Sequence, residues 1–229
     1  MHGRNVIPPA DNMTDFAHAR TVMVDNQLRT SGITDRRLLT AMGEVPRELF
    51  VPQVRRPLAY IDQAIALDGN RKLGAPAPFA KLVQLAGIGG DDHVLDLGCG
   101  TGYSAAVLAR LAHSVVAVDS DGGLIATARS ALRDAGASNV TVVEGPLDTA
   151  GKSKGPYDVI VIEGVISAVP EALFAQLKPE GRLVAPISIE GRPAVAHLFA
   201  RSGKGIAASR AFDAALPPLS APHEDRFVF

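Results

Sequence analysis

Hydrophobic and polar positions follow two alternating rhythms in the second half of the chain. Short runs that are apolar at nearly every position alternate with longer stretches whose apolar residues recur every three or four positions. The first pattern is typical of strands buried on both faces, and the second of amphipathic helices, so we predict parallel strands joined by helical crossovers. The expected strands are 93–98, 114–119, 139–145, 157–164 and 181–187, and the expected helices are 103–112, 123–136 and 170–177.

Two further apolar runs follow these elements. Residues 194–201 and 206–212 are separated by the turn sequence SGKG, which predicts an antiparallel hairpin at one end of the sheet. Together with the five strands before it, the hairpin predicts an α/β fold with a doubly wound, mostly parallel sheet of seven strands.

The residues before the sheet have helical spacing at first. Apolar and small residues recur every three or four positions over 13–42, and Ser31 and Gly32 interrupt them, so we expect two short helices with Thr34 capping the second. Prolines then predict an irregular connection. A loop rich in glycine and proline follows over residues 60–80 and leads into a helix at 79–88.

These patterns predict one domain over residues 13–229, in which an N-terminal helical region (13–80) precedes the α/β core (81–229). Residues 1–12 carry two adjacent prolines and no periodicity, and we expect them to be a disordered extension.

Composition narrows the functional classes. The chain has 229 residues, a hydrophobic fraction of 47% and a net charge of −1, so we expect neither a membrane span nor a nucleic-acid partner. A single cysteine and an N-terminus without a long apolar core favour the cytoplasm. The six histidines are scattered without ligand spacing, and we therefore expect no metal.

The sequence VLDLGCGTGY, residues 94–103, places three glycines directly after the first strand of the core. In a parallel sheet such a turn opens at the carboxyl edge, where ligands bind, and glycines leave no side chain to block them. The dinucleotide fingerprint requires glycine or alanine five residues after Gly98, and Tyr103 occupies that position. Nicotinamide-dependent redox chemistry is therefore the least favoured of the alternatives.

Two acids point to another cofactor. Asp96 would repel a pyrophosphate but suits a ligand with an ammonium group, and S-adenosylmethionine carries an ammonium, a sulfonium and no phosphate. Asp119, at the end of the next strand, is placed to accept hydrogen bonds from both hydroxyls of an adenosine ribose. The loop therefore predicts binding of S-adenosyl-L-methionine.

These motifs resemble a known superfamily. VLDLGCGTGYSAAVLA, VVAVD and LKPEGRLVAPI are similar to the class I S-adenosylmethionine-dependent methyltransferases, which implies a Rossmann-like methyltransferase fold. LLTAMGEVPRELFVP, LAYIDQAIAL and PYDVIVIEGVISAVPEALFAQLKPEGRLVAPI narrow the resemblance to protein-L-isoaspartate O-methyltransferase, over most of residues 20–190. The resemblance implies transfer of a methyl group to a carboxylate of damaged, isoaspartyl protein.

The cofactor residues carry over with one departure. The family has Gly-Asp after the third core strand, with the acid facing the adenine, whereas this chain has Gly145 followed by Pro146. The resemblance and the loop together give the expected cofactor-binding set as Asp96, Gly98, Cys99, Gly100, Gly102, Tyr103, Asp119, Ser120, Gly145 and Pro146. We expect Cys99 to be a packing residue, because no histidine is paired with it in sequence.

The substrate loop departs further. Where the family has a Thr-Ile-Ser stretch, a small residue, proline and often histidine, this chain has RKLGAPA, with Lys72 at the threonine and Gly74 at the serine. Lys72 or Arg71 is expected either to grip an anionic substrate or to point to solvent. Glu163 stands at the carboxyl edge and is expected to contact substrate, to act as a base or to be a rim acid.

The sequence therefore predicts a methyltransferase with a protein or peptide substrate, and Lys72, Gly74 and Glu163 as the candidates near the acceptor. Two alternatives stay open. The chain could methylate another acceptor, such as a small molecule or RNA, or it could be a cofactor-binding module without catalysis, as Pro146 and Gly74 suggest.

Overall fold

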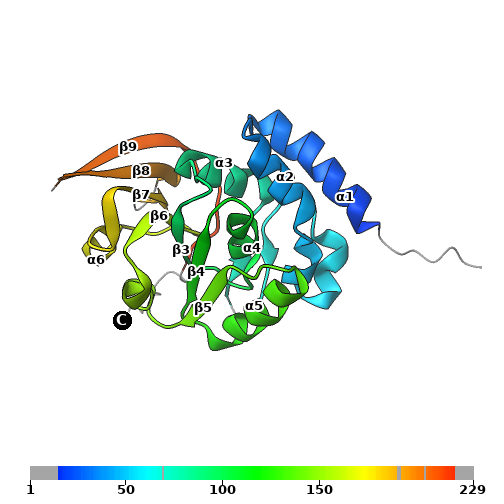
Figure 1. Ribbon diagram of the computed structural model, residues 1–229. Helices are drawn as coiled ribbons and strands as arrows, with labels where there is room; N and C mark the ends of the chain where they lie inside the picture. Colours follow the sequence, from blue (N-terminus) through cyan, green and yellow to red (C-terminus); the bar gives the residue numbers. More distant parts are fainter. Residues whose placement is uncertain (1–14, 69, 190–191, 204, 220–229) are drawn as a thin grey trace, which may run out of the picture.

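The computed structural model describes residues 15–68, 70–189, 192–203 and 205–219 (Figure 1). The expected disordered extension, residues 1–12, lies outside the described residues. No helix in the described ranges is long and apolar enough to span a bilayer.

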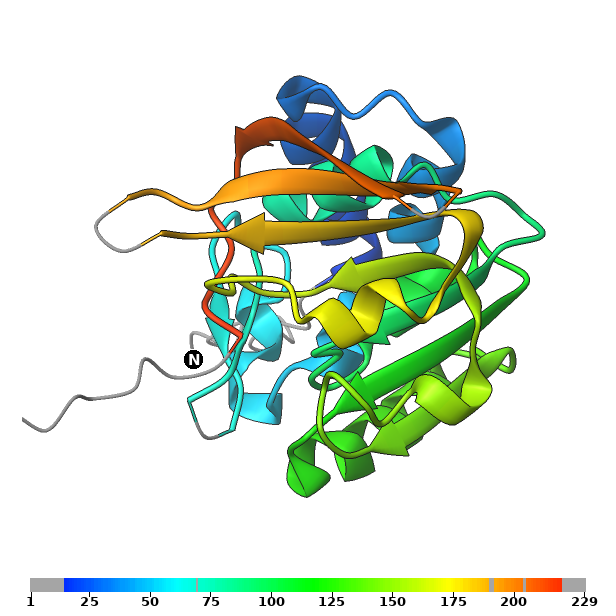
Figure 2. The ribbon, with the colours of Figure 1, turned by 90° about the vertical axis from the view of Figure 1, so that its left-hand side faces the viewer.

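A seven-stranded sheet forms the centre of the molecule (Figure 1). Five neighbouring strands are parallel, and the last two form an antiparallel hairpin at one end, as the sequence predicts (Figure 2). Their order is β5-β4-β3-β6-β7-β8-β9. The strands are β3 (His93–Leu97), β4 (Ser114–Asp119), β5 (Val140–Glu144), β6 (Tyr157–Ile162), β7 (Leu177–Ile187), β8 (Val195–Ser202) and β9 (Gly205–Asp213).

Helices and short turns connect and precede these strands. The helices are α1 (Phe16–Met23), α2 (Arg36–Glu44), α3 (Pro76–Ala86), α4 (Tyr103–Ala109), α5 (Gly122–Asp134) and α6 (Glu171–Phe174). A π-helical turn (Val24–Leu28) and 3-10 turns (Arg29–Ser31, Arg47–Phe50, Gln53–Leu58, Lys152–Lys154) lie between them, and β1 (Ile65–Ala66) pairs with β2 (Lys72–Leu73) in a separate small ribbon.

Strands of the core are buried on both faces. In β3, Val94 packs into one hydrophobic cluster with α3, α4 and the N-terminal region, whereas Leu95 packs into a second cluster on the opposite face. Val159 and Ile160 divide in the same way in β6. Because successive side chains of a strand point to opposite faces, this arrangement requires apolar residues at nearly every position, which is the pattern in the sequence.

Two local expectations are wrong. The second helix is capped by Asp35 and not by Thr34, because the Asp35 carboxylate accepts hydrogen bonds from the backbone N–H groups of Arg37 and Leu38. The helix expected over 170–177 ends at Phe174, because Leu177 already begins β7 and pairs with Tyr157. In the first case the side chain of the next residue makes the cap, and in the second case strand pairing ends the helix earlier than the local pattern indicates.

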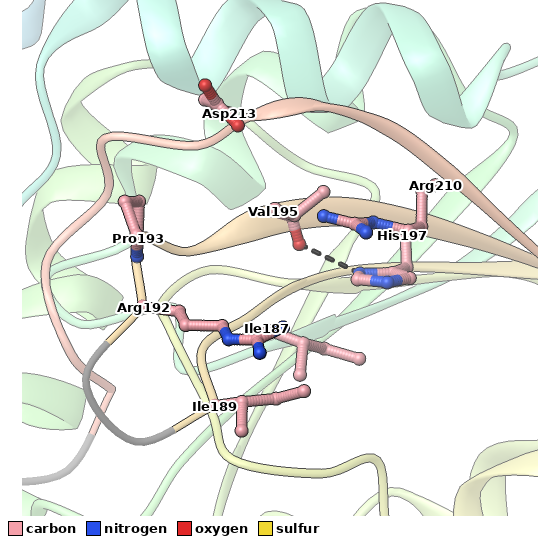
Figure 3. Close-up of a pocket in the computed structure, with 8 residues that line it drawn as sticks. All are labelled: Ile187, Ile189, Arg192, Pro193, Val195, His197, Arg210 and Asp213. Atoms are coloured by element: carbon pink, nitrogen blue, oxygen red, sulfur yellow. Dashed lines mark hydrogen bonds between the residues drawn. The ribbon is translucent and has the colours of Figure 1, made fainter.

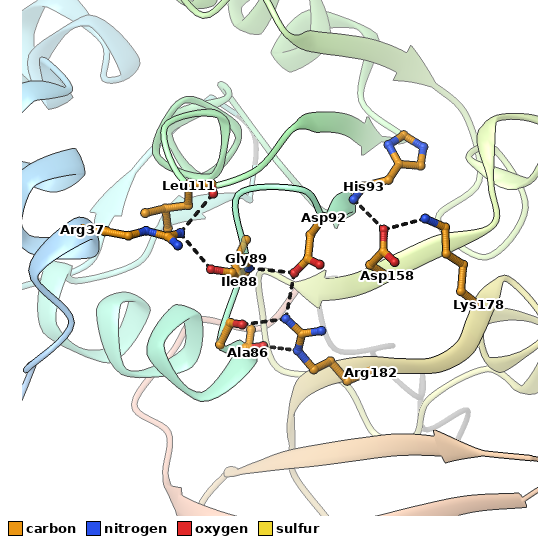
Figure 4. Close-up of polar contacts among 11 residues, drawn as sticks. Arg37, Ala86, Ile88, Gly89, Asp92, His93, Leu111, Asp158, Lys178 and Arg182 are labelled. Atoms are coloured by element: carbon orange, nitrogen blue, oxygen red, sulfur yellow. Dashed lines mark hydrogen bonds and ion pairs between the residues drawn. The ribbon is translucent and has the colours of Figure 1, made fainter.

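Polar contacts tie the amino ends of the strands to the helices (Figure 4). Arg182 of β7 forms an ion pair with Asp92 (2.8 Å) and donates to the backbone carbonyls of Ala86 and Gly87, at the end of α3. Lys178 pairs with Asp158 (2.7 Å), whose carboxylate also accepts the N–H of His93. The bonds from Arg182 satisfy helix-terminal carbonyls that have no partner within the helix.

Candidate functional site

The glycine loop lies at the carboxyl end of β3, as predicted. Gly98, Gly100 and Gly102 have φ angles of +80°, +55° and +94°, a region that side-chain-bearing residues seldom adopt. The N–H of Gly98 donates to the Val118 carbonyl (2.8 Å), which joins the loop to β4. Three left-handed residues in five positions produce the sharp turn that starts α4 beside the sheet edge.

Asp96 lies beneath this loop and is fully buried. Its Oδ2 atom accepts a hydrogen bond from the Ser104 hydroxyl (2.7 Å), and its Oδ1 atom has no partner among the described residues. Burial raises the pKa of Asp96 to about 7, and the nearby Asp119 adds to the rise while the Ser104 bond opposes it. An orphaned, buried carboxylate oxygen of this kind fits a cationic ligand group.

Asp119 ends β4 and is also fully buried. Its Oδ2 atom accepts the N–H of Gly100 (2.8 Å), so the two acids flank the glycine loop. Its Oδ1 atom accepts from the backbone N–H of Asp121 (3.2 Å) and from the guanidinium of Arg71 (2.8 Å). Arg71 also donates to the Gly98 carbonyl (2.9 Å). The expectation that Arg71 meets substrate or solvent missed this contact, since nothing in RKLGAPA indicates it.

Cys99 and Tyr103 are predicted cofactor residues whose side chains are turned into the protein. Cys99 is buried, and burial raises the pKa of its thiol well above the usual value, which makes a nucleophilic thiolate unfavourable. The Tyr103 ring packs against Phe50 and Phe79, with both centroid separations 5.7 Å, and the Arg47 guanidinium lies 4.5 Å from its centre. Both side chains belong to the hydrophobic cluster that also contains residues of α3 and α4.

The remaining cofactor candidates lie along the ends of β4 and β5. Ser120 is exposed next to Asp119, and the N–H of Gly145 donates to the Asp119 carbonyl (3.0 Å). Pro146 is exposed and begins a turn by accepting the N–H of Ala150 (2.8 Å). A cavity of about 210 Å³ lies beside this turn; its lining includes Leu97, Leu147, Asp148, Ile162, Ile166 and Leu219.

The loop before α3 holds the two substrate-loop candidates in different environments. Lys72 is exposed on the β1–β2 ribbon. The Gly74 carbonyl accepts a hydrogen bond from Arg47 (2.5 Å), and a Cβ placed on Gly74 would lie 2.8 Å from the Cδ2 atom of Leu216. Gly74, which the sequence resemblance places at the family's serine, is therefore covered by the side chain of Leu216.

Glu163 follows β6 and lies next to the glycine loop, because its N–H donates to the Leu97 carbonyl (2.9 Å). Its Oε1 atom is buried and has no partner in the described ranges. Burial raises the pKa of Glu163 well above its usual value; the Asp96 carboxylate contributes to the rise and the Arg47 cation opposes it. The residue as a whole is half-buried, so its roles as a substrate contact, a base or a rim acid stay predictions.

Arg47 is a residue that the sequence did not single out. It is fully buried, donates to the Ala59 carbonyl (2.8 Å) and to Gly74, and leaves its Nη1 atom without a partner among the residues described. Burial lowers the pKa of its guanidinium, although Tyr103 and Glu163 oppose this effect. Its only signal in the sequence is a position within VPRELF, which on its own does not separate a buried arginine from an exposed one.

A second cavity, of about 280 Å³, opens at the carboxyl end of β7 (Figure 3). Ile187 forms its apolar side, and Arg192, Arg210 and His197 line it, with the His197 ring bonded to the Val195 carbonyl (2.9 Å). Ile187 pairs with Ile166, which follows Glu163 by three residues. The cavity therefore offers guanidinium groups at the same sheet edge as the glycine loop.

In the part of the chain that the structure describes, no three or more histidine, cysteine, aspartate or glutamate side chains are grouped so that they could hold a metal ion. The polar groups at the carboxyl edge come from the ends of β3, β4 and β6 and from the loop before α3.

Comparison with known proteins gives a consistent result. A family model described as Protein-L-isoaspartate(D-aspartate) O-methyltransferase matches residues 19–215. Protein-L-isoaspartate O-methyltransferase 2 of Pelobacter propionicus is 39% identical over 170 residues, which are 74% of this chain and 76% of that protein. The corresponding protein of Roseiflexus castenholzii is 35% identical over 91% of this chain and 95% of its own length.

Solved structures show the same likeness. A protein-L-isoaspartate O-methyltransferase superposes with a TM-score of 0.77 at 26% identity; the alignment covers 88% of this chain but 66%, just under two thirds, of that structure. A Plasmodium falciparum structure in complex with S-adenosyl-L-homocysteine superposes with a TM-score of 0.75 at 21% identity, and supports the fold.

Proposed function

The chain belongs to the protein-L-isoaspartate(D-aspartate) O-methyltransferase family, and we propose that it transfers the methyl group of S-adenosylmethionine to a carboxylate of isoaspartyl residues in proteins. The observation that carries this proposal is the extent of the family match, residues 19–215, which includes the glycine loop, both acids and the substrate loop. Repair of damaged protein in the cytoplasm is the setting that this reaction implies.

The acids at the carboxyl edge supply the cofactor contacts in this proposal. Asp96 offers its orphaned Oδ1 atom to the ammonium group, and Asp119 offers its carboxylate to the ribose hydroxyls. The left-handed backbone of the glycine loop allows a ligand to approach the sheet edge closely. When bound, S-adenosylmethionine supplies an electrophilic methyl group on a sulfonium.

The remaining task of the chain is to hold the acceptor. A carboxylate with an ordinary pKa near 4 is ionised at neutral pH, so methyl transfer to it needs no general base. The protein contributes by placing the nucleophile in line and by excluding water, and the buried surroundings of Gly74 and Glu163 serve the second purpose.

Glu163 takes the role of an acceptor-positioning group in this proposal. Because its pKa is raised, the carboxyl of Glu163 stays protonated to higher pH than an ordinary glutamate, and in that form it donates a hydrogen bond, which an ionised rim acid cannot do. Such a donor replaces the hydroxyl that is missing at Gly74, and no proton is taken from the acceptor. Lys72, exposed at the entrance, and the guanidinium groups of the cavity in Figure 3 are available to anionic side chains of a protein acceptor.

The test is transfer of a labelled methyl group to an isoaspartyl peptide and to its aspartyl twin. We expect label on the isoaspartyl peptide alone, and loss of label in Asp119→Ala, which removes the proposed ribose contact. Cofactor binding without label on either peptide would contradict the proposal. That outcome would favour another acceptor or a non-catalytic module, the two alternatives that the altered substrate loop leaves open.

A further inference from the structure

The segment of residues 214–219, here called the strap, crosses the carboxyl edge of the sheet after β9. It is held beside the residues that follow β6: the N–H of Val165 donates to the Pro217 carbonyl (2.9 Å), and the N–H of Leu219 donates to the Val165 carbonyl (3.0 Å). Val165 and Pro218 thus form a parallel bridge. The strap is part of the ordered edge and not a loose end.

Gly98 and Gly74 of the proposed site, together with Gly164 next to Glu163, lie directly under the strap. A Cβ placed on Gly98 would lie 2.1 Å from the Cδ1 atom of Leu219, and one on Gly164 would lie 2.9 Å from the Leu219 Cα atom. A Cβ on Gly74 would meet Leu216 at 2.8 Å. These separations are shorter than any non-bonded contact between carbon atoms, so the strap fills the space that the glycines leave open.

Burial of Leu219 keeps the strap in place. Its side chain is 6% exposed and belongs to the hydrophobic cluster of Leu97 and Ile162. Removing a leucine side chain from water is favourable, so the closed position is the ground state when no ligand competes.

Arg71 occupies the carboxylate of Asp119, which is the proposed contact to the ribose of the cofactor. Its guanidinium bridges the Asp119 carboxylate (2.8 Å) and the Gly98 carbonyl (2.9 Å), across the space between β3 and β4. Only 15% of its side chain is exposed. A ribose that reaches the Oδ1 atom of Asp119 must replace this ion pair, just as a ligand chain above Gly98 must replace Leu219.

We propose that the strap and Arg71 hold the chain in a self-inhibited state, in which Leu219 and the cofactor compete for the space above Gly98. This inference rests on the proposed function only for the identity of the cofactor. The apparent affinity for the cofactor is reduced by the fraction of molecules in which the strap is open. Leu216 belongs to the same strap and covers Gly74, so opening of the strap uncovers the cofactor loop and the substrate loop together.

The first experiment is calorimetric titration of the full chain with S-adenosyl-L-homocysteine. Leu219→Ala is expected to bind at least tenfold more tightly than the unaltered chain, although its Tm is lower. The matched control is Leu111→Ala, which removes a leucine of similar burial, 4% exposed, at the opposite edge of the sheet near Arg37 (Figure 4). We expect it to lower the Tm and leave the affinity unchanged.

Equal or weaker binding by Leu219→Ala would overturn the self-inhibition and leave the proposed function intact. If neither the unaltered chain nor any variant binds S-adenosyl-L-homocysteine, the cofactor assignment is contradicted. The proposed competition between the strap and that cofactor is then contradicted as well. The two failures are therefore distinguishable in one set of titrations.

A second measurement uses the unaltered chain and does not depend on a variant that folds. Hydrogen exchange is followed with and without S-adenosyl-L-homocysteine. Exchange at the amides of Val165 and Leu219 is expected to become faster on binding, because their hydrogen bonds to the Pro217 and Val165 carbonyls are broken, while the glycine loop becomes protected. Slower or unchanged exchange at these two amides would show that ligand and strap are bound together, which overturns the proposal.

Discussion

The two ends of the same parallel strands differ in how their polar side chains are paired. At the amino edge, the half-buried Asp92 and Asp158 are ion-paired, and Arg182 satisfies helix-terminal carbonyls (Figure 4). Among the described residues at this edge, the buried Oε1 atom of Gln176 has no partner. At the carboxyl edge, four side chains each bury a polar atom that has no partner within the described ranges: Arg47, Asp96, Tyr103 and Glu163.

The difference indicates a division of labour between the two edges. An unpartnered buried polar group costs on the order of 1–3 kcal/mol, so four of them in one region are a sizeable cost in stability. Such a cost is tolerated where a ligand or substrate completes the hydrogen bonds. The amino edge is therefore expected to determine stability, and the carboxyl edge to determine binding.

The largest effect is expected from breaking the amino edge. Arg182→Ala removes the ion pair with Asp92 and the donors to Ala86 and Gly87. We expect a loss of about 3 kcal/mol in the free energy of unfolding, measured by urea denaturation, because the Asp92 carboxylate is left partly buried and unpaired. Cofactor affinity is expected to stay unchanged.

The control is Arg29→Ala, which breaks an ion pair with Asp25 whose side chains are more than half exposed. Its expected cost is about 0.5 kcal/mol. Equal losses for the two arginine variants would contradict the assignment of the amino edge as the stabilising one.

Breaking the carboxyl edge is expected to act on affinity instead. Asp119→Asn removes the charge that the ribose hydroxyls require, and we expect S-adenosyl-L-homocysteine to bind about thirtyfold more weakly, a loss on the order of 2 kcal/mol. Asp121→Asn is the matched control, because the new residue can still cap α5. If both variants bind equally well, Asp119 does not hold the cofactor.

The pH dependence of affinity sharpens the comparison further. With its pKa raised to about 7, Asp96 is mostly protonated at pH 6 and mostly ionised at pH 8. A cationic group prefers the ionised form, so affinity is expected to rise about tenfold from pH 6 to pH 8, with proton release in titrations below pH 7. Asp96→Asn is expected to lose this dependence, and an unaltered slope in that variant would exclude Asp96 as its source.

The stability of the cofactor-free protein is expected to change in the opposite direction. Because the pKa of Asp96 is higher in the folded protein than its ordinary value of 3.8, the folded state keeps a proton that the unfolded chain loses. Stability therefore falls as pH rises from about 4 to 7.

The smallest expected effect comes from Glu163→Gln. The raised pKa of Glu163 makes ionisation unfavourable in the folded protein only, so a neutral amide is expected to increase stability at pH 7 and to leave it unchanged near pH 4, where both states hold the proton. Thermal unfolding at the two pH values measures this difference. An equal change at both would mean that packing, and not ionisation, causes it.

Local sequence was sufficient for the sheet and for the central part of the site. Strands buried on both faces need apolar residues at every position, and this requirement is visible in β3 and β6 without any structure. The glycine loop and its two acids were predicted because each lies within a few residues of a strand end, and the carboxyl ends of neighbouring parallel strands always meet at one edge. Their individual contacts with a cofactor remain predictions.

What the sequence did not determine are the contacts made across long separations. Arg71 meets Asp119 from 48 positions away, Arg47 holds Gly74 from 27 positions away, and Leu219 reaches Gly98 from the far end of the chain. A periodic pattern shows which residues need burial, but it does not show against which partner they are buried. Those pairings follow from how the N-terminal region and the strap pack onto the sheet, so only the tertiary structure decided that the carboxyl edge is covered.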